Sequence, residues 1–378
     1  MAIDTRLPSE SDLETVDINV NVGPQHPATH GVFRMILTID GELVVDVDPV
    51  IGYMHRGNEK LPENCDYRQV IGYHDRTDYL AQFNTEHCYV EAVEKLAAIT
   101  PPERAEYIRV ILAELNRIAS HFMFMGAFGT DLGLPGTAFM YAFREREVIQ
   151  DFFEELTGER MMYNYFRPGG VAWDVPEDFR TRCQQVLSSV GVGIQDLGSL
   201  LMENEVVLAR CRGLSPVSAE DGINWGLTGP MLRATGLMHD IRRAEPYSIY
   251  DRFDFDVPTG QRGDVYDRLA VRLEEMHQSV RIVQQALEEL PEGPIMADGL
   301  KRVLRVPAGE VYMRVESPRG EYGVYLVSQG SDKPWRHKVR GASFSNLSAL
   351  RMMAVGNYVA DVILILGSTD IVLCEVDR

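Results

Sequence analysis

Alternating apolar and polar residues near the start of the chain predict a small β-sheet. A period of two places alternate side chains on a core, as in a half-buried strand. Two runs show this period: Val16, Ile18, Val20 and Val22, and then Phe33, Met35, Leu37 and Ile39. Asp40-Gly41 separates the second run from apolar residues at 43–47, and this dipeptide is typical of a tight hairpin. We therefore expect a β-sheet over residues 16–50.

In the middle of the chain the apolar residues recur at intervals of three and four, which predicts amphipathic helices. Thr100-Pro-Pro-Glu103 has the spacing of a capping box with proline at the first helical position, so a long helix should begin there and end near Gly129. The same pattern predicts a helix that ends at Gly158, a helix over residues 179–213 and a helix after Asp264. We expect residues 80–300 to form a mainly antiparallel helix bundle.

The C-terminal residues 305–378 combine a β-hairpin with a buried helix. Apolar alternation on both sides of Pro318-Arg-Gly320 predicts the hairpin. Residues 347–366 alternate apolar and small side chains with only Arg351 and Asp361 charged, which is typical of a helix buried on most sides. No repeat or linker interrupts the chain. We expect a flexible tail over residues 1–15 and one α+β domain over residues 16–378.

Composition and charge narrow the class of protein. The chain has 378 residues, 45% of them hydrophobic, and no apolar run long enough to span a bilayer. Its N-terminal residues lack the basic and apolar segments of a signal or transit peptide. A formal net charge of -19 disfavours nucleic acid as a partner. The five cysteines include no C-x-x-C pair, which indicates a reducing compartment and no cysteine-only metal site.

A histidine-bearing loop joins the first two predicted strands and is the first candidate for chemistry. His26 and His30 are four residues apart, but the prolines and glycines around them oppose a helix. A zinc-protease pair is rejected, since that motif needs a helix and a glutamate where Pro27 stands. No Gly-x-Ser-x-Gly or glycine-rich phosphate loop is present either. From the residues alone, two roles stay open for these histidines. They could be catalytic, or they could hold the loop in shape through hydrogen bonds to the backbone, which is the commoner role.

The run Val22-Gly-Pro-Gln-His-Pro-Ala-Thr-His-Gly-Val-Phe-Arg34 resembles the opening of the D subunit of NADH-quinone oxidoreductase, the respiratory complex I subunit related to the large subunit of nickel–iron hydrogenases. The resemblance covers nearly the whole chain from Val16 onward. It continues, in order, through residues 51–60, Arg76-Thr-Asp-Tyr-Leu80, Arg167-Pro-Gly-Gly170, residues 228–233, Ala244-Glu-Pro-Tyr247, residues 250–256 and Cys374-Glu-Val-Asp-Arg378. It implies an α+β, hydrogenase-large-subunit-like fold.

The resemblance also implies that His30 and Tyr79 hold a quinone head group between them and that Asp131 is the acidic partner of His30. A quinone that takes up two electrons also takes up two protons, so its site needs groups that donate hydrogen bonds or protons. A carboxylate beside an imidazole favours the charged ring and fixes its orientation. Taken singly, Tyr79 would be an ordinary half-buried tyrosine and Asp131 a turn residue between glycines. The three motifs together favour His30, Tyr79 and Asp131 as catalytic residues.

Arg56 matches an arginine that, in this family, lies near the terminal iron–sulfur cluster of the neighbouring B subunit. A fixed positive charge there would favour the reduced cluster. The alternative is a surface ion pair with Glu59. The cysteine pairs that hold nickel and iron in hydrogenases are missing, with Val372 and Glu375 at the two C-terminal ligand positions, so we expect no metal and no flavin bound by this chain itself. Cys374 is expected to be a buried, inert thiol.

The resemblance therefore predicts the quinone-binding subunit of a proton-translocating NADH-quinone oxidoreductase. Quinone would be the substrate, and NAD and the iron–sulfur clusters would belong to other subunits. Expected partners are the B and C subunits of complex I and the membrane arm, with the chain peripheral on the cytoplasmic side of the cell membrane. Two alternatives remain: a hydrogenase-related large subunit of a membrane-bound complex with another electron donor, and a non-catalytic assembly scaffold.

Overall fold

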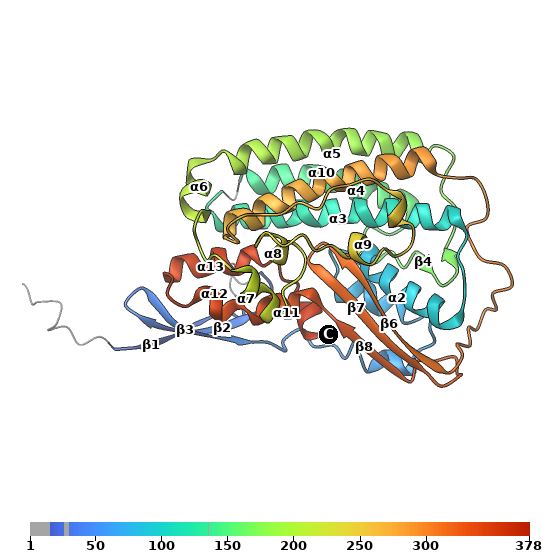
Figure 1. Cartoon of the computed structure of the whole chain (residues 1–378), viewed down its shortest axis with the longest axis horizontal. Helices are drawn as coiled ribbons and strands as arrows, with labels where there is room; N and C mark the ends of the chain where they lie inside the picture. The colour runs from blue at the N-terminus through green and yellow to red at the C-terminus, as the bar shows by residue number, and fades with distance from the viewer. Residues whose placement is uncertain (1–15, 26–29, 135) are drawn as a thin grey trace, which may run out of the picture.

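The computed structural model describes residues 16–25, 30–134 and 136–378, and the predicted N-terminal sheet is confirmed (Figure 1). Its strands β1 (Ile18–Val22), β2 (Arg34–Asp40) and β3 (Leu43–Val50) pair antiparallel in the order β1-β2-β3. Gly41, at a φ of 61°, makes the predicted turn between β2 and β3. Along β2 buried and half-buried residues alternate, so one face of the sheet lies on the core. The predicted tail and His26 lie outside the described residues.

Four long helices form the predicted bundle and run side by side in Figure 1. They are α3 (Glu103–Asp131), α4 (Ala138–Thr157), α5 (Phe179–Met202) and α10 (Val265–Glu289). α3 packs against α4 and α10, and α5 packs against the same two helices. Gly158 ends α4 at a φ of 78°, as predicted, and its N–H donates to the Glu154 carbonyl oxygen. The Asp264 side chain caps α10 by accepting from the Asp267 N–H.

Two predicted helix boundaries were wrong because local capping differs from the pattern. The helix expected over residues 179–213 is broken after α5, and α6 (Glu205–Cys211) begins anew because the Asn204 side chain accepts from the Val206 N–H at 2.9 Å. α3 begins at Glu103 after Pro102, without a side-chain cap from Thr100. Proline fixes the backbone at this helix start, so no capping box is needed.

The single buried helix expected over residues 347–366 was also wrong. The structure has α11 (Ala342–Ser348), α12 (Leu350–Ala354) and α13 (Val359–Ser368) instead. The break falls at Gly356, which has a φ of 85°. There the Gly356 N–H donates to the Val44 carbonyl oxygen and the Val44 N–H donates to the Asn357 carbonyl oxygen, each at 2.9 Å. Pairing with strand β3 therefore replaces helical hydrogen bonds at this point.

The predicted C-terminal hairpin is confirmed and gains a third strand. β6 (Gly309–Ser317), β7 (Gly320–Ser328) and β8 (Arg336–Arg340) form an antiparallel sheet in that order. β8 was not predicted from the sequence, because three of its five residues are arginine or lysine. α2 (Gln82–Ala97) packs on this sheet and on α1 (Ile71–Thr77). The remaining elements are short: η3 (Leu61–Asn64), β4 (Phe166–Arg167), β5 (Gly170–Val171), α7 (Ala219–Asn224), α8 (Pro230–Arg233), α9 (Ile241–Ala244), η4 (Tyr250–Arg252) and α14 (Leu373–Asp377).

Two hydrophobic cores hold these layers together. The larger core fills the bundle and reaches the C-terminal sheet, and the smaller one joins the N-terminal sheet to the C-terminal helices. In the smaller core, Met35 and Leu37 of β2 lie with Ile365 and Leu366 of α13, and α13 also packs against α3. This arrangement brings the chain before β2 close to the C-terminal end of α3. None of the described helices has both the length and the apolar character needed to cross a membrane.

Candidate functional site

Five segments of the chain line one cavity of about 340 Å³. They are the chain before β2, the connection between α1 and α2, the C-terminal half of α3, the start of α4 and the connection between α13 and α14. Much of the wall is apolar, with Met123, Phe124, Phe139, Ile371 and Val372. Its polar side chains include His30, Tyr79, Thr130, Asp131 and Asp370. A mainly apolar pocket with a few convergent polar groups is typical of a small-molecule site.

The structure places His30 and Asp131 in direct contact inside this cavity. His30 Nε2 lies 2.5 Å from Asp131 Oδ2, and the two side chains are only 14% and 7% exposed. Burial alone would lower the pKa of His30, but the hydrogen bond and charge of Asp131, with a smaller contribution from the charge of Asp370, raise it above 6.5. The imidazole is therefore held in one orientation and favoured in its charged, doubly donating form.

Gly367 of α13 lies against the His30–Asp131 pair, and the space between them is too small for a side chain. A Cβ atom at this position would be 2.5 Å from Asp131 Oδ2 and 3.2 Å from His30 Nε2. The close approach of α13 thus depends on glycine, although alanine is the better helix former by about 1 kcal/mol. The helix backbone forms one wall of the His30–Asp131 contact.

Gly367→Ala should consequently separate the pair and lower the pKa of His30. The new methyl group must displace Asp131 or His30, and the carboxylate that favours imidazolium then moves away. The pKa is measured by NMR titration of the histidine side chains in the full chain, with His30→Gln to assign the signal. Gly191→Ala in α5 is the matched control, since its Cβ would meet nothing within 4 Å. An unchanged His30 pKa in Gly367→Ala would show that the pair tolerates the methyl group.

Tyr79 lies on the same cavity with its hydroxyl group available. It is half-buried in the connection between α1 and α2, and the Gln82 side chain donates to its backbone carbonyl oxygen. In the described part of the chain, no side chain or backbone group forms a hydrogen bond with the Tyr79 hydroxyl. Burial, reinforced by the nearby Cys374, raises the pKa of Tyr79. The phenol therefore stays protonated at neutral pH and can donate a hydrogen bond to a ligand.

A buried ion-pair cluster next to Tyr79 was not predicted. Arg319 Nη1 lies 2.8 Å from Asp78 Oδ2, and its Nη2 lies 3.5 Å from Asp370 Oδ1. In addition, Arg272 Nε lies 3.8 Å from Asp370 Oδ2. The cluster links the residue before Tyr79 to a residue of the cavity wall. The only sign of this cluster in the sequence was that Asp78 lies within the motif Arg76-Thr-Asp-Tyr-Leu80.

Glu375 is a second unexpected group near this cluster. It is fully buried and accepts hydrogen bonds from the Ala342 N–H at 2.8 Å and the Ser343 N–H at 3.1 Å. Burial and the charge of Asp78 outweigh these hydrogen bonds and the charge of Arg319, which raises the pKa of Glu375 to about 7. This buried carboxyl group can therefore change its charge near neutral pH.

Arg56 lies outside the cavity on an exposed segment. This segment is fastened to the C-terminus, because the N–H groups of Gly52 and Met54 donate to the Asp377 carboxylate at 2.8 and 2.6 Å. The alternative pairing of Arg56 with Glu59 is not formed, since Glu59 accepts from Lys338 at 2.7 Å. Among the residues that the structure describes, Arg56 has no ion-pair partner.

Cys374, which lies beside this segment, is 3% exposed. Burial raises the pKa of its thiol, although the charge of Arg56 opposes the shift. A thiol held in its protonated form is unreactive toward oxidants and metals. The predicted burial of Cys374 is confirmed, and its inertness stays a prediction.

Comparison with known proteins places this α+β chain among the respiratory-chain oxidoreductase subunits. Residues 131–305 and 299–378 match the family described as "Respiratory-chain NADH dehydrogenase, 49 Kd subunit". The D subunit of NADH-quinone oxidoreductase from Dehalococcoides mccartyi is 53% identical over 366 residues, which cover 97% of this chain and 100% of the relative. The D subunit of Carboxydothermus hydrogenoformans is 51% identical over 365 residues with the same coverage. A D subunit of Roseiflexus sp. is 49% identical over 373 residues, again covering 97% and 100%.

The chain belongs to this family of NADH-quinone oxidoreductase D subunits. The predicted family and enzyme class are confirmed, as is the α+β fold class with small antiparallel sheets. The hydrogenase-like detail of the fold stays a prediction, as do the roles of individual site residues.

Proposed function

We propose that this chain holds the quinone of an NADH:quinone oxidoreductase in the cavity lined by His30 and Tyr79. The observation that carries the proposal is the convergence of two different donors on one largely apolar cavity: an imidazole paired with Asp131 at 2.5 Å and a phenol hydroxyl without a hydrogen-bond partner in the described residues. Each can donate to one quinone carbonyl oxygen. The apolar side chains suit the ring and the start of an isoprenoid tail.

Reduction adds two electrons and two protons to the quinone and gives the quinol. The raised pKa of His30 favours imidazolium, in which both ring nitrogens are protonated: Nε2–H donates to Asp131, and Nδ1–H is the proton left to donate to the quinone. The Tyr79 hydroxyl, kept protonated by burial, holds the other carbonyl and can supply the second proton. Asp131 stabilises the imidazolium before this transfer and receives no proton itself, and His30 is left as the neutral imidazole. The electrons come from an iron–sulfur cluster that belongs to the B subunit.

We further propose that the chain is a peripheral subunit on the cytoplasmic side of the cell membrane, in contact with the B and C subunits and the membrane arm, and that quinone reduction drives proton translocation by other subunits. Apolar side chains near the site support such a shared surface: Val32, Ile51 and Tyr53 are 43%, 42% and 45% exposed. Exposed apolar groups close to a ligand cavity are typical of subunit interfaces. Arg56, three residues after Tyr53, would face the B subunit from this surface.

Asp131→Asn tests the role of the paired histidine. The change keeps the side-chain shape but removes the negative charge, so the pKa of His30 should fall. Quinone reduction by the assembled complex should then weaken most at higher pH, where the variant has lost its imidazolium and the wild type still keeps it. The stability that the pair contributes is fully present below about pH 6.5 and disappears as the pH rises through the raised pKa of the folded state.

Asp46→Asn is the matched control for this test. Asp46 forms an exposed ion pair with Arg351, far from the cavity lining, so the same loss of charge should leave the pH profile of quinone reduction unchanged. If Asp131→Asn also keeps the wild-type profile, His30 does not act through Asp131 and the proposed proton donor is lost.

A further inference from the structure

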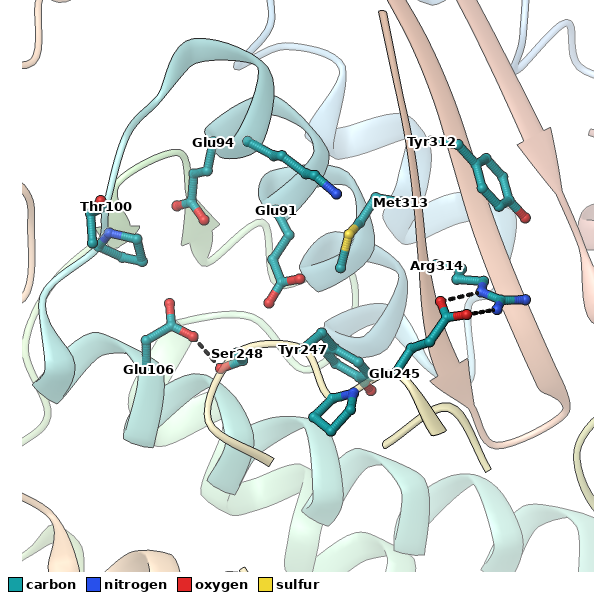
Figure 2. A pocket seen from close by; sticks show the side chains of 13 residues that line it. Glu91, Glu94, Thr100, Glu106, Glu245, Tyr247, Ser248, Tyr312, Met313 and Arg314 are labelled. Atoms are coloured by element: carbon teal, nitrogen blue, oxygen red, sulfur yellow. Dashed lines mark hydrogen bonds and ion pairs between the residues drawn. The ribbon is translucent and has the colours of Figure 1, made fainter. Parts of the chain in front are cut away.

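A second cavity, of about 490 Å³, lies between α2, the start of α3, β6 and the connection around Tyr247 (Figure 2). It shares no lining residue with the His30 cavity. Four carboxylates line it: Glu91, Glu94, Glu106 and Glu245. Glu245 is matched by Arg314, to which it is joined in Figure 2. The other three carboxylates, Glu91, Glu94 and Glu106, have no role in the proposed quinone chemistry.

Charge is not balanced among these three carboxylates. Arg109 pairs with Glu94 at 2.7 Å and with Glu106 at 2.8 Å, so one guanidinium serves two buried acids. Among the residues described, Glu91 pairs only with the imidazole of His87. Lys95 also lines the cavity, but its side chain is exposed and forms no ion pair within the described residues. Buried carboxylates without enough cationic partners favour binding of a cation.

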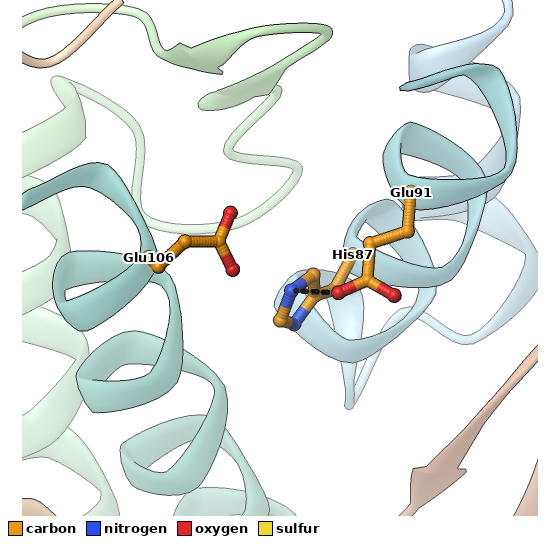
Figure 3. Close-up of side chains that lie close together, drawn as sticks. All are labelled: His87, Glu91 and Glu106. Atoms are coloured by element: carbon orange, nitrogen blue, oxygen red, sulfur yellow. Dashed lines mark ion pairs between the residues drawn. The ribbon is translucent and has the colours of Figure 1, made fainter. Parts of the chain in front are cut away.

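His87 lies beside these carboxylates, and its Nε2 is close to Glu91 without the geometry of a hydrogen bond. It is 1% exposed, and its Nε2 has no hydrogen-bond partner in the described part of the chain. The same atom lies 3.1 Å from Glu91 Oε1, one turn farther along α2. Glu106 approaches from α3 on the other side (Figure 3). One nitrogen of His87 and one oxygen from each glutamate all lie within 4.8 Å of one another.

The side chains behind this triad hold it in place. Glu106 accepts from Arg109 through one carboxylate oxygen and from the Ser248 hydroxyl through the other. The His87 ring packs edge-on against Phe166 and Tyr247, with ring centroids 5.6 Å away in each case. Such outer contacts orient metal ligands and are part of a metal site.

We propose that His87 Nε2 and the carboxylates of Glu91 and Glu106 bind a divalent transition-metal ion of the Zn²⁺ type. One imidazole nitrogen and two carboxylate oxygens are ligands that Zn²⁺ accepts, and the cavity leaves room for water as the fourth. Two ligands on one ion lie roughly 3–4 Å apart for bonds of about 2.0–2.2 Å, so only small side-chain movements are needed. The ion would join α2 to α3 and balance the excess negative charge.

This proposal departs from the expectation that the chain itself binds no metal. That expectation covered any metal, but it rested on the missing cysteine pairs, which bear only on metals held by thiolates. The new site uses no sulfur. His87 and Glu91 stand four apart on a helix, which was the only signal in the sequence, and Glu106 joins them only through the packing of α2 against α3.

Titration of the tag-free, chelator-treated full chain with ZnCl₂ tests the site by calorimetry. We expect one equivalent of Zn²⁺ to bind and X-ray absorption to show one imidazole nitrogen, oxygen ligands and no sulfur. His87→Phe keeps the ring contacts, and Glu91→Gln keeps the side-chain shape. Each should weaken binding by at least the roughly 10–100-fold that loss of an outer-shell contact typically costs. Glu245→Gln is the matched control, which removes a charge from the same cavity but no ligand.

Three results would overturn the site: no stoichiometric Zn²⁺ in the wild-type chain, unchanged affinity in both ligand variants, or an equal loss in Glu245→Gln. Glu91→Gln keeps the test valid if His87→Phe does not fold, because Glu91 lies at the half-buried edge of the cavity. The proposed quinone site is unaffected by either outcome, since no residue is shared between the two cavities.

Discussion

Arg319→Met should lower the free energy of unfolding by about 3–5 kcal/mol, the usual cost of removing one partner from a buried ion pair. Arg319 and Asp78 are both completely buried, and Asp370 is 8% exposed. Methionine fills a similar volume, so the loss comes mainly from Asp78, which remains buried without its cation, while Asp370 keeps Arg272 at 3.8 Å. The same change should loosen the quinone cavity, because Asp78 precedes Tyr79 and Asp370 lines the wall.

Denaturant unfolding of the full chain measures this effect, and its pH dependence identifies the cause. Burial already raises the pKa of Asp78 despite the charge of Arg319, and removing that charge raises the pKa further. The folded variant therefore binds protons more strongly than the wild type, and its deficit should shrink as the pH falls. Arg182→Met is the control, since its exposed pair with Glu155 should contribute only about 0–1 kcal/mol. A deficit of that small size in Arg319→Met would contradict the structural role of the cluster.

Local sequence patterns predicted those elements whose stability is local. Asp40-Gly41 identified a hairpin because its turn geometry depends on two residues, and the three-and-four period of large apolar side chains identified α3 and α10. The break at Gly356 could not be predicted in this way. It depends on backbone hydrogen bonds to Val44, a residue more than three hundred positions earlier in the chain.

The candidate site was predicted from family resemblance rather than from pattern. Periodicity says nothing about the contact between His30 and Asp131, which are 101 residues apart. The resemblance named both residues and Tyr79, and the structure brings all three to one cavity. It did not point to Arg319, and it named Glu375 only as a residue in place of a cysteine ligand, because the charges of both depend on burial next to Asp78. Burial of a charge depends on the whole fold and leaves no local mark in the sequence.

Tyr79→Phe should reduce quinone reduction by tenfold or more in an assembled complex that is otherwise intact. The ring and nearly all of its packing remain, and a hydroxyl with no hydrogen-bond partner in the described residues is removed, so stability should change little. If that hydroxyl holds a quinone carbonyl, a neutral hydrogen bond worth about 0.5–1.5 kcal/mol is lost. Loss of a proton donor typically costs a further ~10²–10⁴-fold in rate.

Quinone reduction is measured beside ferricyanide reduction, which takes electrons upstream and should stay at the wild-type rate. Short-chain quinones should be affected most, because they have little tail binding with which to reach the head-group position. Tyr325→Phe is the matched control: its exposed hydroxyl donates to Glu310 at 2.6 Å, away from the cavity. Wild-type quinone turnover in an intact Tyr79→Phe complex would remove Tyr79 from the site. His30 would then have to bind and protonate the quinone without the second donor that the cavity geometry provides.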